Sequence, residues 1–166
     1  MTSGEGGAII TDDKKLFEKL KQIRNHGMSK NRLTTMFGLN LRLPEINAAI
    51  AKVQMKKLPG LLEKRKKKAQ ILTDILKNSD IILPKQRKGE TLNWYLYTIA
   101  LKNRNNIMKK LNSSGIGATI YYSPPIHKTP YYKTKAKLPN TEWATCHVLS
   151  LPIHPMVSKS DMVRMK

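Results

Sequence analysis

The sequence has a single cysteine, Cys146, among its 166 residues. One thiol cannot form an intrachain disulfide, nor can it supply the group of thiolates that holds a structural zinc ion. An adjacent His147 is no partner for a catalytic thiol, because neighbouring residues on a helix point in different directions. The other histidines, His26, His127 and His154, are too widely spaced for a local metal motif. We therefore expect no metal centre and a reducing compartment.

Long apolar runs are also absent. The densest, residues 46–53, contains Asn47 and Lys52 and is far shorter than the ~20 residues that span a bilayer. The first seven residues have neither the basic start nor the apolar middle of a secretion signal. These observations predict a cytoplasmic protein without a membrane helix.

Acidic residues are scarce: 11 Asp and Glu stand against 31 Lys and Arg, giving a formal net charge of +20. The run from Lys56 to Lys68 holds seven of the cations and one acid, Glu63. Such a patch can bind nucleic acid non-specifically, or it can be the solvated face of an amphipathic helix. No nucleic-acid motif or aromatic platform accompanies the run, which favours the helix face.

Hydrophobic residues make up 40% of the chain, enough for a core at this length. The apolar periodicity predicts an α/β fold. Strands are predicted at residues 8–11, 94–101, 116–120 and 148–151. Helices are predicted from Asp12 or Asp13 to Gly27, over 43–57, 61–77, 103–114 and 142–147, and from Ser158 or Ser160 onward. Pro59 and Gly60 separate the second and third of these helices. Residues 26–42 are predicted to form a loop or short hairpin, and 123–140 an irregular loop.

Two loops carry candidate ligand groups. Asn40 and Arg42 lie two residues apart, so in an extended segment both side chains share a face and can meet one anion. An Asx turn beside a surface arginine is the alternative. Tyr121, Tyr122 and His127 occupy a loop stiffened by proline, which can hold polar groups toward a ligand. Aromatic packing at the edge of a small sheet is the alternative there.

Several segments together resemble the DegT/DnrJ/StrS family. They are Thr2–Asp13 (TSGEGGAIITDD), Arg24–Gly27 (RNHG), Gly38–Leu43 (GLNLRL), Trp94–Tyr97 (WYLY), Tyr122–His127 (YSPPIH) and Leu149–Pro155 (LSLPIHP). The likeness covers nearly the whole chain, in order. It implies a nucleotide-sugar aminotransferase dependent on pyridoxal phosphate, of fold type I, working as a homodimer with shared active sites. The amino group would pass, usually from glutamate, to a nucleotide-linked keto-sugar, for polysaccharide or cell-surface glycan synthesis.

The resemblance also implies a domain plan. Only the carboxy-terminal portion of such an enzyme is expected: residues 1–57 as a remnant of the large cofactor-binding domain, 58–80 as a long connecting helix, and 81–166 as the small α/β domain, truncated in its last helix. The apolar strand at 8–11 and the helix at 43–57 would then lack cover. We expect oligomerisation, aggregation or dependence on a missing large-domain polypeptide.

Site residues carry over one by one. Asn40 matches the family position whose amide reaches the cofactor phosphate of the neighbouring subunit, and Arg42 lies beside it. Tyr121, Tyr122 and His127 match the loop that approaches the sugar. No catalytic residue is expected here, because the family's Schiff-base lysine would lie upstream of Met1. The chain alone is therefore expected to be inactive. The alternatives are the second piece of a split aminotransferase and a decayed basic remnant that binds nucleic acid.

Overall fold

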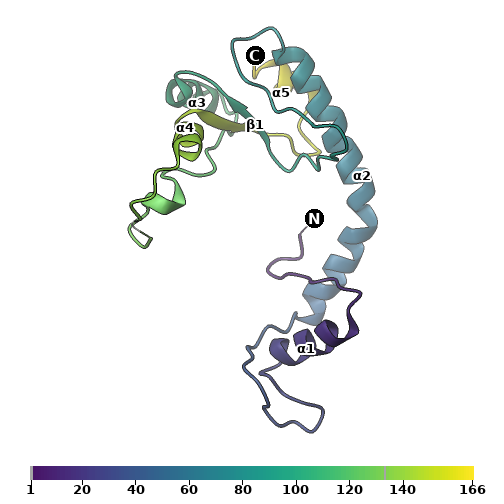
Figure 1. Ribbon diagram of the computed structural model, residues 1–166. Coiled ribbons are helices and arrows are strands. Elements are labelled where there is room, and N and C mark those ends of the chain that lie inside the picture. The colour runs from purple at the N-terminus through teal and green to yellow at the C-terminus, as the bar shows by residue number, and fades with distance from the viewer. Residues whose placement is uncertain (1, 133) are drawn as a thin grey trace. The chain divides into compact units, whose positions relative to one another are not determined.

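The computed structural model describes residues 2–132 and 134–166. The chain divides into two compact units, Met1–Pro59 and Gly60–Lys166. Figure 1 shows the helices and strands of each unit. Whether the first unit is the end of a large cofactor-binding domain stays a prediction.

The first unit begins with an extended segment and the helix α1, Lys14–Arg24. The Asp13 carboxylate caps α1 by accepting hydrogen bonds from the backbone N–H groups of Lys15 and Leu16, at 2.8 and 3.1 Å, as its sequence predicts. The strand predicted at 8–11 is wrong, since the structure assigns no strand there. A single extended segment forms no ladder without a neighbouring strand, and Ile9 and Ile10 are 73% and 93% exposed.

The helix α2 runs without a break over Glu45–Leu76. The prediction of two separate helices is therefore wrong, because Pro59 lies inside the helix. Proline removes one helical N–H and leaves the carbonyl of the residue four positions earlier, Met55, unpaired. Met55 and Pro59 are both exposed, so water can bind that carbonyl. The free-energy cost of the proline is therefore small enough for the helix to continue.

The second unit is built around a two-stranded antiparallel sheet. The strand β1, Tyr97–Ala100, pairs with β2, Val148–Leu151, in a register that places Tyr97 opposite Leu151. These strands confirm the predictions at 94–101 and 148–151. The strand predicted at 116–120 is wrong, since Thr119 forms only an isolated bridge to Ser150. The mixture of helix and sheet agrees with the α/β class expected.

The core of the second unit packs the end of α2 against this sheet. Tyr97, Leu72 and Leu149 are fully buried, and the Tyr97 hydroxyl lies 2.8 Å from that of Thr73. Burial of the ring raises the pKa of Tyr97. The other buried apolar residues of this core are Ala69, Leu76, Ile99, Ile116, Ala118, Leu151, Ile153, Met162 and Met165.

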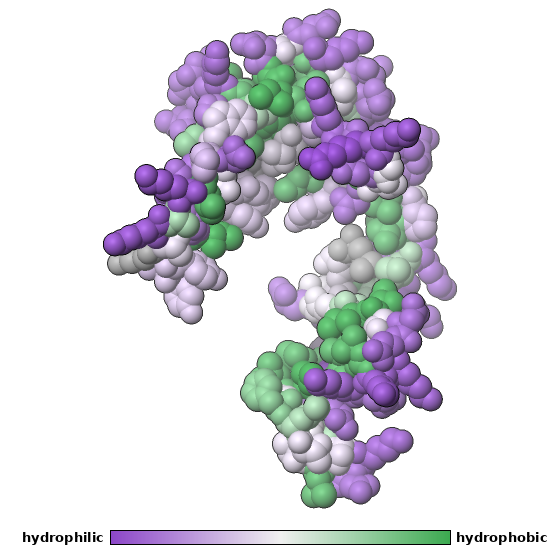
Figure 2. Space-filling view, in the orientation of Figure 1, coloured by the Kyte–Doolittle hydropathy of each residue, from purple (hydrophilic) through white to green (hydrophobic). Residues whose placement is uncertain are grey.

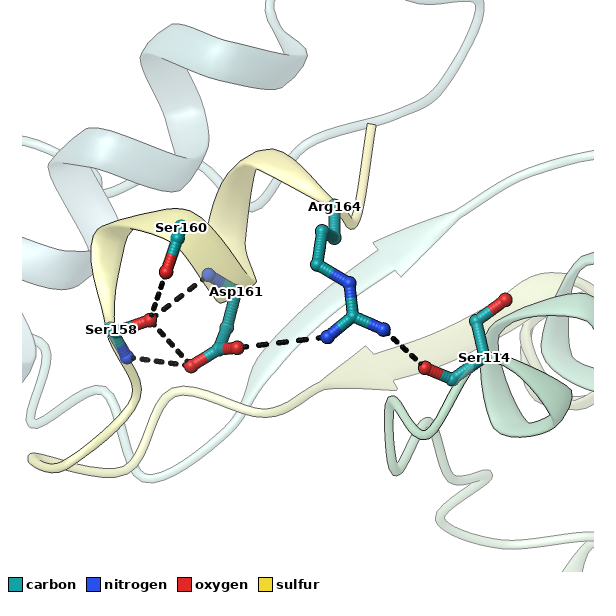
Figure 3. A network of polar contacts seen from close by, with 5 residues as sticks. All are labelled: Ser114, Ser158, Ser160, Asp161 and Arg164. Carbon is teal, nitrogen blue, oxygen red and sulfur yellow. Dashed lines mark hydrogen bonds and ion pairs between the residues drawn. The ribbon is translucent and has the colours of Figure 1, made fainter.

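Three further α-helices complete the second unit: α3, Arg104–Ser113, α4, Pro139–His147, and α5, Lys159–Val163, with a short 3₁₀ turn, η1, at Ile126–Lys128. Ser158 caps α5, as expected, in a reciprocal capping box with Asp161. Hydrogen bonds from Ser158 lower the pKa of Asp161. The Nη1 of Arg164 lies 3.8 Å from Oδ1 of Asp161, and its Nη2 donates to the Ser114 carbonyl at 2.5 Å (Figure 3). The network ties α5 to the end of α3.

Across the described parts of the chain, no helix is both long and apolar enough to cross a membrane. The cytoplasmic location expected from the sequence stays a prediction.

Candidate functional site

The segment Gly38–Arg42 lies along the end of α1. Leu39 donates its N–H to the Ile23 carbonyl at 2.8 Å, and Leu41 donates to the Arg24 carbonyl at 2.9 Å. In return, the Leu39 carbonyl accepts from His26 at 3.0 Å. These bonds and the bridges Asn25–Asn40 and Met28–Thr34 make residues 26–42 hairpin-like, as predicted.

Two glycines allow the backbones of this loop to approach closely. Gly27 has φ +68°, and a Cβ there would lie 1.8 Å from the Met36 carbonyl oxygen. A Cβ on Gly38 would lie 2.0 Å from the backbone nitrogen of Gly27. Both contacts are too short for any side chain. The Arg24–Gly27 and Gly38–Leu43 motifs therefore depend on each other, which the sequence reading of Gly27 as a helix stop did not reveal.

Asn40 and Arg42 meet at this loop. The Nε of Arg42 donates to Oδ1 of Asn40 at 2.9 Å, and both residues are exposed. This bond involves the amide oxygen, in place of the Asx turn considered from the sequence. This bond uses neither the N–H groups of the Asn40 amide nor the terminal nitrogens of Arg42. Among the described residues, these atoms make no hydrogen bond or ion pair.

The donor set of this pair fits a phosphate group. An amide and a guanidinium both donate, and no carboxylate of the described residues pairs with Arg42. Charge-assisted bonds from arginine to phosphate are among the strongest that proteins make. The pair thus suits the phosphate end of pyridoxal phosphate, although its role in cofactor binding stays a prediction.

Asn47, near the start of α2, makes a long-range contact that the sequence did not predict. Its side-chain Nδ2 donates to the Glu5 carbonyl at 3.1 Å and so holds the glycine-rich turn at residues 4–7 against α2. A Cβ on Gly4, which has φ +80°, would lie 3.2 Å from this Nδ2. An asparagine inside a predicted helix gives no signal of such a long-range bond, so nothing in the single sequence identifies it.

In the second unit, Tyr121 and Tyr122 lie together. Their ring centroids are 5.3 Å apart with the planes nearly perpendicular. With Pro125, Ile126 and residues of α4 they line a cavity of about 440 Å³. The structure thus brings two of the three predicted sugar-binding residues to one cavity.

His127 is placed differently. Its side chain is only 10% exposed, and Nε2 lies 3.3 Å from Oε1 of Glu142. Lys128 contacts the other oxygen of Glu142 at 2.8 Å, and this bond, followed by the one from His127, holds the pKa of Glu142 below its ordinary value. His127 does not line the tyrosine cavity. Its imidazole ties the loop to α4, and its predicted contact with sugar stays a prediction.

We expect Glu142→Gln to loosen the loop 126–138. The neutral amide loses the charge that attracts Lys128, and trypsin should cleave after Lys128 about two- to fivefold faster. Acidification should act in the same direction. Because the folded pKa of Glu142 is lowered, the stabilisation is present above the carboxylate's ordinary pKa and is lost as pH falls through the lowered value.

The matched control is Glu63→Gln, which removes an exposed carboxylate paired with Lys67 at 3.9 Å and should leave cleavage after Lys128 unchanged. Equal cleavage rates in the Glu142 variant and the native chain would show that this cluster does not hold the loop.

The basic run on α2 is partly used within the second unit. Arg65 donates to the carbonyls of Trp94 and Tyr95 at 2.9 and 3.1 Å, and Lys68 donates to the Val157 carbonyl. Two of the seven cations therefore anchor backbone. This supports the interpretation of the run as a helix face rather than a nucleic-acid interface.

The comparisons with known proteins agree with the resemblance. The model of the DegT/DnrJ/EryC1/StrS aminotransferase family matches residues 1–165. A pleiotropic regulatory protein of Geobacillus stearothermophilus is 34% identical over 165 residues, covering 95% of this chain and 44% of that protein. The dTDP-3-amino-3,6-dideoxy-alpha-D-galactopyranose transaminase of Aneurinibacillus thermoaerophilus is 32% identical over 161 residues, covering 96% and 44%.

A solved structure shares the fold. The DegT DnrJ EryC1 StrS aminotransferase from Brucella abortus superposes with a TM-score of 0.87 at 29% identity, over 93% of this chain and 43% of that one. The chain thus spans less than half the length of the relatives that it matches, as expected for a portion of a fold-type I aminotransferase. Since the family model covers almost every residue, the chain belongs to the DegT/DnrJ/EryC1/StrS aminotransferase family.

Proposed function

We propose that this chain is the carboxy-terminal part of an aminotransferase that transfers an amino group, from glutamate, to a nucleotide-linked keto-sugar for polysaccharide or cell-surface glycan synthesis. Family membership supports the reaction class. The name of the Aneurinibacillus thermoaerophilus relative, a dTDP-sugar transaminase, supports the substrate class. The single observation that carries the proposal is the Asn40–Arg42 pair, whose donors suit a phosphate.

Pyridoxal phosphate is the cofactor of the family's complete enzymes, and when bound it supplies the electron sink for amino transfer. Asn40 would hold its phosphate through the amide N–H groups, and Arg42 through the terminal guanidinium nitrogens. The bond from Arg42 to Asn40 Oδ1 orients the amide so that its N–H groups stay available to donate to the phosphate. Gly27 and Gly38 fix the loop that presents both side chains.

Within the second unit, Tyr121 and Tyr122 are the residues that we propose for contact with the sugar. Both residues are exposed; a tyrosine hydroxyl can donate to and accept from sugar hydroxyls, and the rings offer an apolar wall. The Schiff-base lysine would come from another part of the enzyme. A homodimer, in which Asn40 serves the cofactor of the neighbouring subunit, is the assembly that we propose, with a separate large-domain polypeptide as the alternative.

The test is a chimera of the Aneurinibacillus thermoaerophilus transaminase in which this chain replaces the matching segment. We expect it to bind pyridoxal phosphate and to aminate a dTDP-linked keto-sugar. Asn40→Asp keeps the oxygen that accepts from Arg42 but turns a donor into a carboxylate. It should weaken cofactor binding by about 10- to 100-fold, since a charged hydrogen bond contributes roughly 1.5–3 kcal/mol.

Asn31→Asp in the same loop is the control, since it adds the same charge at an exposed position and should leave cofactor affinity unchanged. A folded chimera that binds no cofactor would contradict the proposal. Equal affinities for the Asn40→Asp and Asn31→Asp chimeras would remove Asn40 from the site.

A further inference from the structure

A second, smaller cavity lies beside the tyrosine cavity, within the second unit. Its volume is about 160 Å³, and Tyr121 lines both cavities. Its polar lining comes from several elements: α2, the segment before β1, the segment after α3, β2 and the segment after β2. The residues are, in that order, Arg65, Tyr95, Thr119 with Tyr121, Ser150 and His154. No acidic residue is among the lining residues. The cavity therefore contains a cation and hydrogen-bond donors without a neutralising carboxylate.

Arg65 is the fixed cation of this cavity. Its Nη1 donates to the carbonyls of Trp94 and Tyr95 at 2.9 and 3.1 Å, so the plane of the guanidinium is set before any ligand arrives. Within residues 2–132 and 134–166, Arg65 has no ion pair, and its Nε and Nη2 make no hydrogen bond. The side chain is half-buried. A half-buried guanidinium without a counter-charge favours an anion that accepts from its free nitrogens.

His154 contributes a second oriented donor. Its Nδ1 lies 2.9 Å from the backbone N–H of Met156. Because a backbone N–H can only donate, Nδ1 is the acceptor, and the proton of the neutral ring is on Nε2. The ring therefore offers an N–H at its outer edge. Tyr95, which is 70% exposed and lines the same cavity, supplies a third donor group in its hydroxyl.

We propose that this cavity binds an oxyanion, a carboxylate or a phosphate, with Arg65, His154 and Tyr95 as its donors. Its volume suits one such group and not a whole nucleotide sugar. The shared wall at Tyr121 places the oxyanion next to a ligand in the larger cavity. The origin of the anion rests on the proposed function: the carboxylate of the amino donor or the phosphate of the nucleotide sugar.

The test is calorimetric titration of the full chain with inorganic phosphate and, separately, with glutarate, at constant ionic strength. Constant ionic strength matters because a net charge of +20 attracts any anion non-specifically. Saturable binding is expected for one or both probes. Tighter binding of phosphate would assign the cavity to the nucleotide sugar, and tighter binding of glutarate to the amino donor.

Arg65→Gln should weaken binding of the preferred probe by about tenfold or more, and Tyr95→Phe by about three- to tenfold. The controls are Arg87→Gln, a highly exposed arginine, and Tyr131→Phe, 87% exposed; neither residue lines the cavity. Both controls should bind like the native chain.

Arg65 also anchors backbone, so its variant can fail to fold. In that case Tyr95→Phe and His154→Phe test the proposal. Both residues are exposed, so the variants should fold, and each removes one donor from the cavity. Binding that is absent in the native chain, or unchanged in these two variants, would overturn the proposal. The titration involves no amino transfer, so its outcome is independent of the chimera that tests the proposed function.

Discussion

At micromolar concentration the purified chain is expected to sediment as dimers and larger species, because its first unit has almost no interior. Among the described residues of that unit, 2–59, Gly27 alone is buried. Large apolar side chains are exposed along its length, and Figure 2 shows apolar residues at its surface. They are Ile9, Ile10, Leu16, Phe17, Leu33, Phe37, Leu39, Leu41, Ile46, Ile50, Val53 and Met55.

This exposure is more than a monomeric protein usually tolerates. Full burial of one such side chain contributes roughly 1.5–3 kcal/mol, which is about one to two powers of ten in an association constant. The predicted homodimer would cover this surface with a second copy. A large-domain polypeptide would cover it equally well, and its addition should then shift the sedimentation to a single defined complex.

Substitution tests the assignment of this surface. The double variant Ile10→Ser and Phe37→Ser removes two side chains that are 93% and 80% exposed. It should raise the concentration at which half the chain is associated by at least about tenfold. Met156→Ser is the control, because Met156 is 79% exposed but belongs to the second unit. A native chain that stays monomeric at every concentration would contradict this prediction.

The elements that could be predicted from the sequence are those whose causes are local. Asp13 caps α1, and Ser158 and Asp161 cap α5; each cap needs only residues within three positions. The strand predicted at 8–11 is wrong because a strand forms only beside a neighbouring strand, and the residues of the segment itself do not supply one. The break predicted at Pro59 is wrong for the opposite reason. Proline disfavours a helix locally, but α2 continues on both sides of Pro59.

The candidate sites divide in the same way. The two-residue spacing of Asn40 and Arg42 is local, and the structure brings the side chains into contact. His127 carries no local sign that Glu142, fifteen residues away, would hold its imidazole. Arg65 reads as one cation in a basic run, although its position is set by carbonyls 29 and 30 residues along the chain. Long-range partners of this kind are what a single sequence does not contain.

Gly38→Ala is expected to open the loop that presents Asn40 and Arg42. The added Cβ would lie 2.0 Å from the Gly27 nitrogen and 2.6 Å from the His26 carbonyl carbon. Both atoms are backbone, so no side chain can move aside, and the two segments that carry Gly27 and Gly38 must separate. Separation breaks the bonds of Leu39 to Ile23 and of Leu41 to Arg24, together with that from His26 to Leu39.

Three hydrogen bonds at about 1 kcal/mol each amount to a loss of about 3 kcal/mol, at the upper end of ordinary single substitutions. Amide hydrogen exchange at Leu39 and Leu41 reports this directly and should accelerate by about 100-fold. Gly7→Ala is the control, because nothing lies within 4 Å of a Cβ at that position. Unchanged exchange at Leu39 and Leu41 in the Gly38 variant would mean that the close approach of the two glycines does not shape this loop. Since Asn40 lies between these two amides, the same variant should lose the Asn40–Arg42 arrangement, and with it the phosphate affinity that we attribute to the pair.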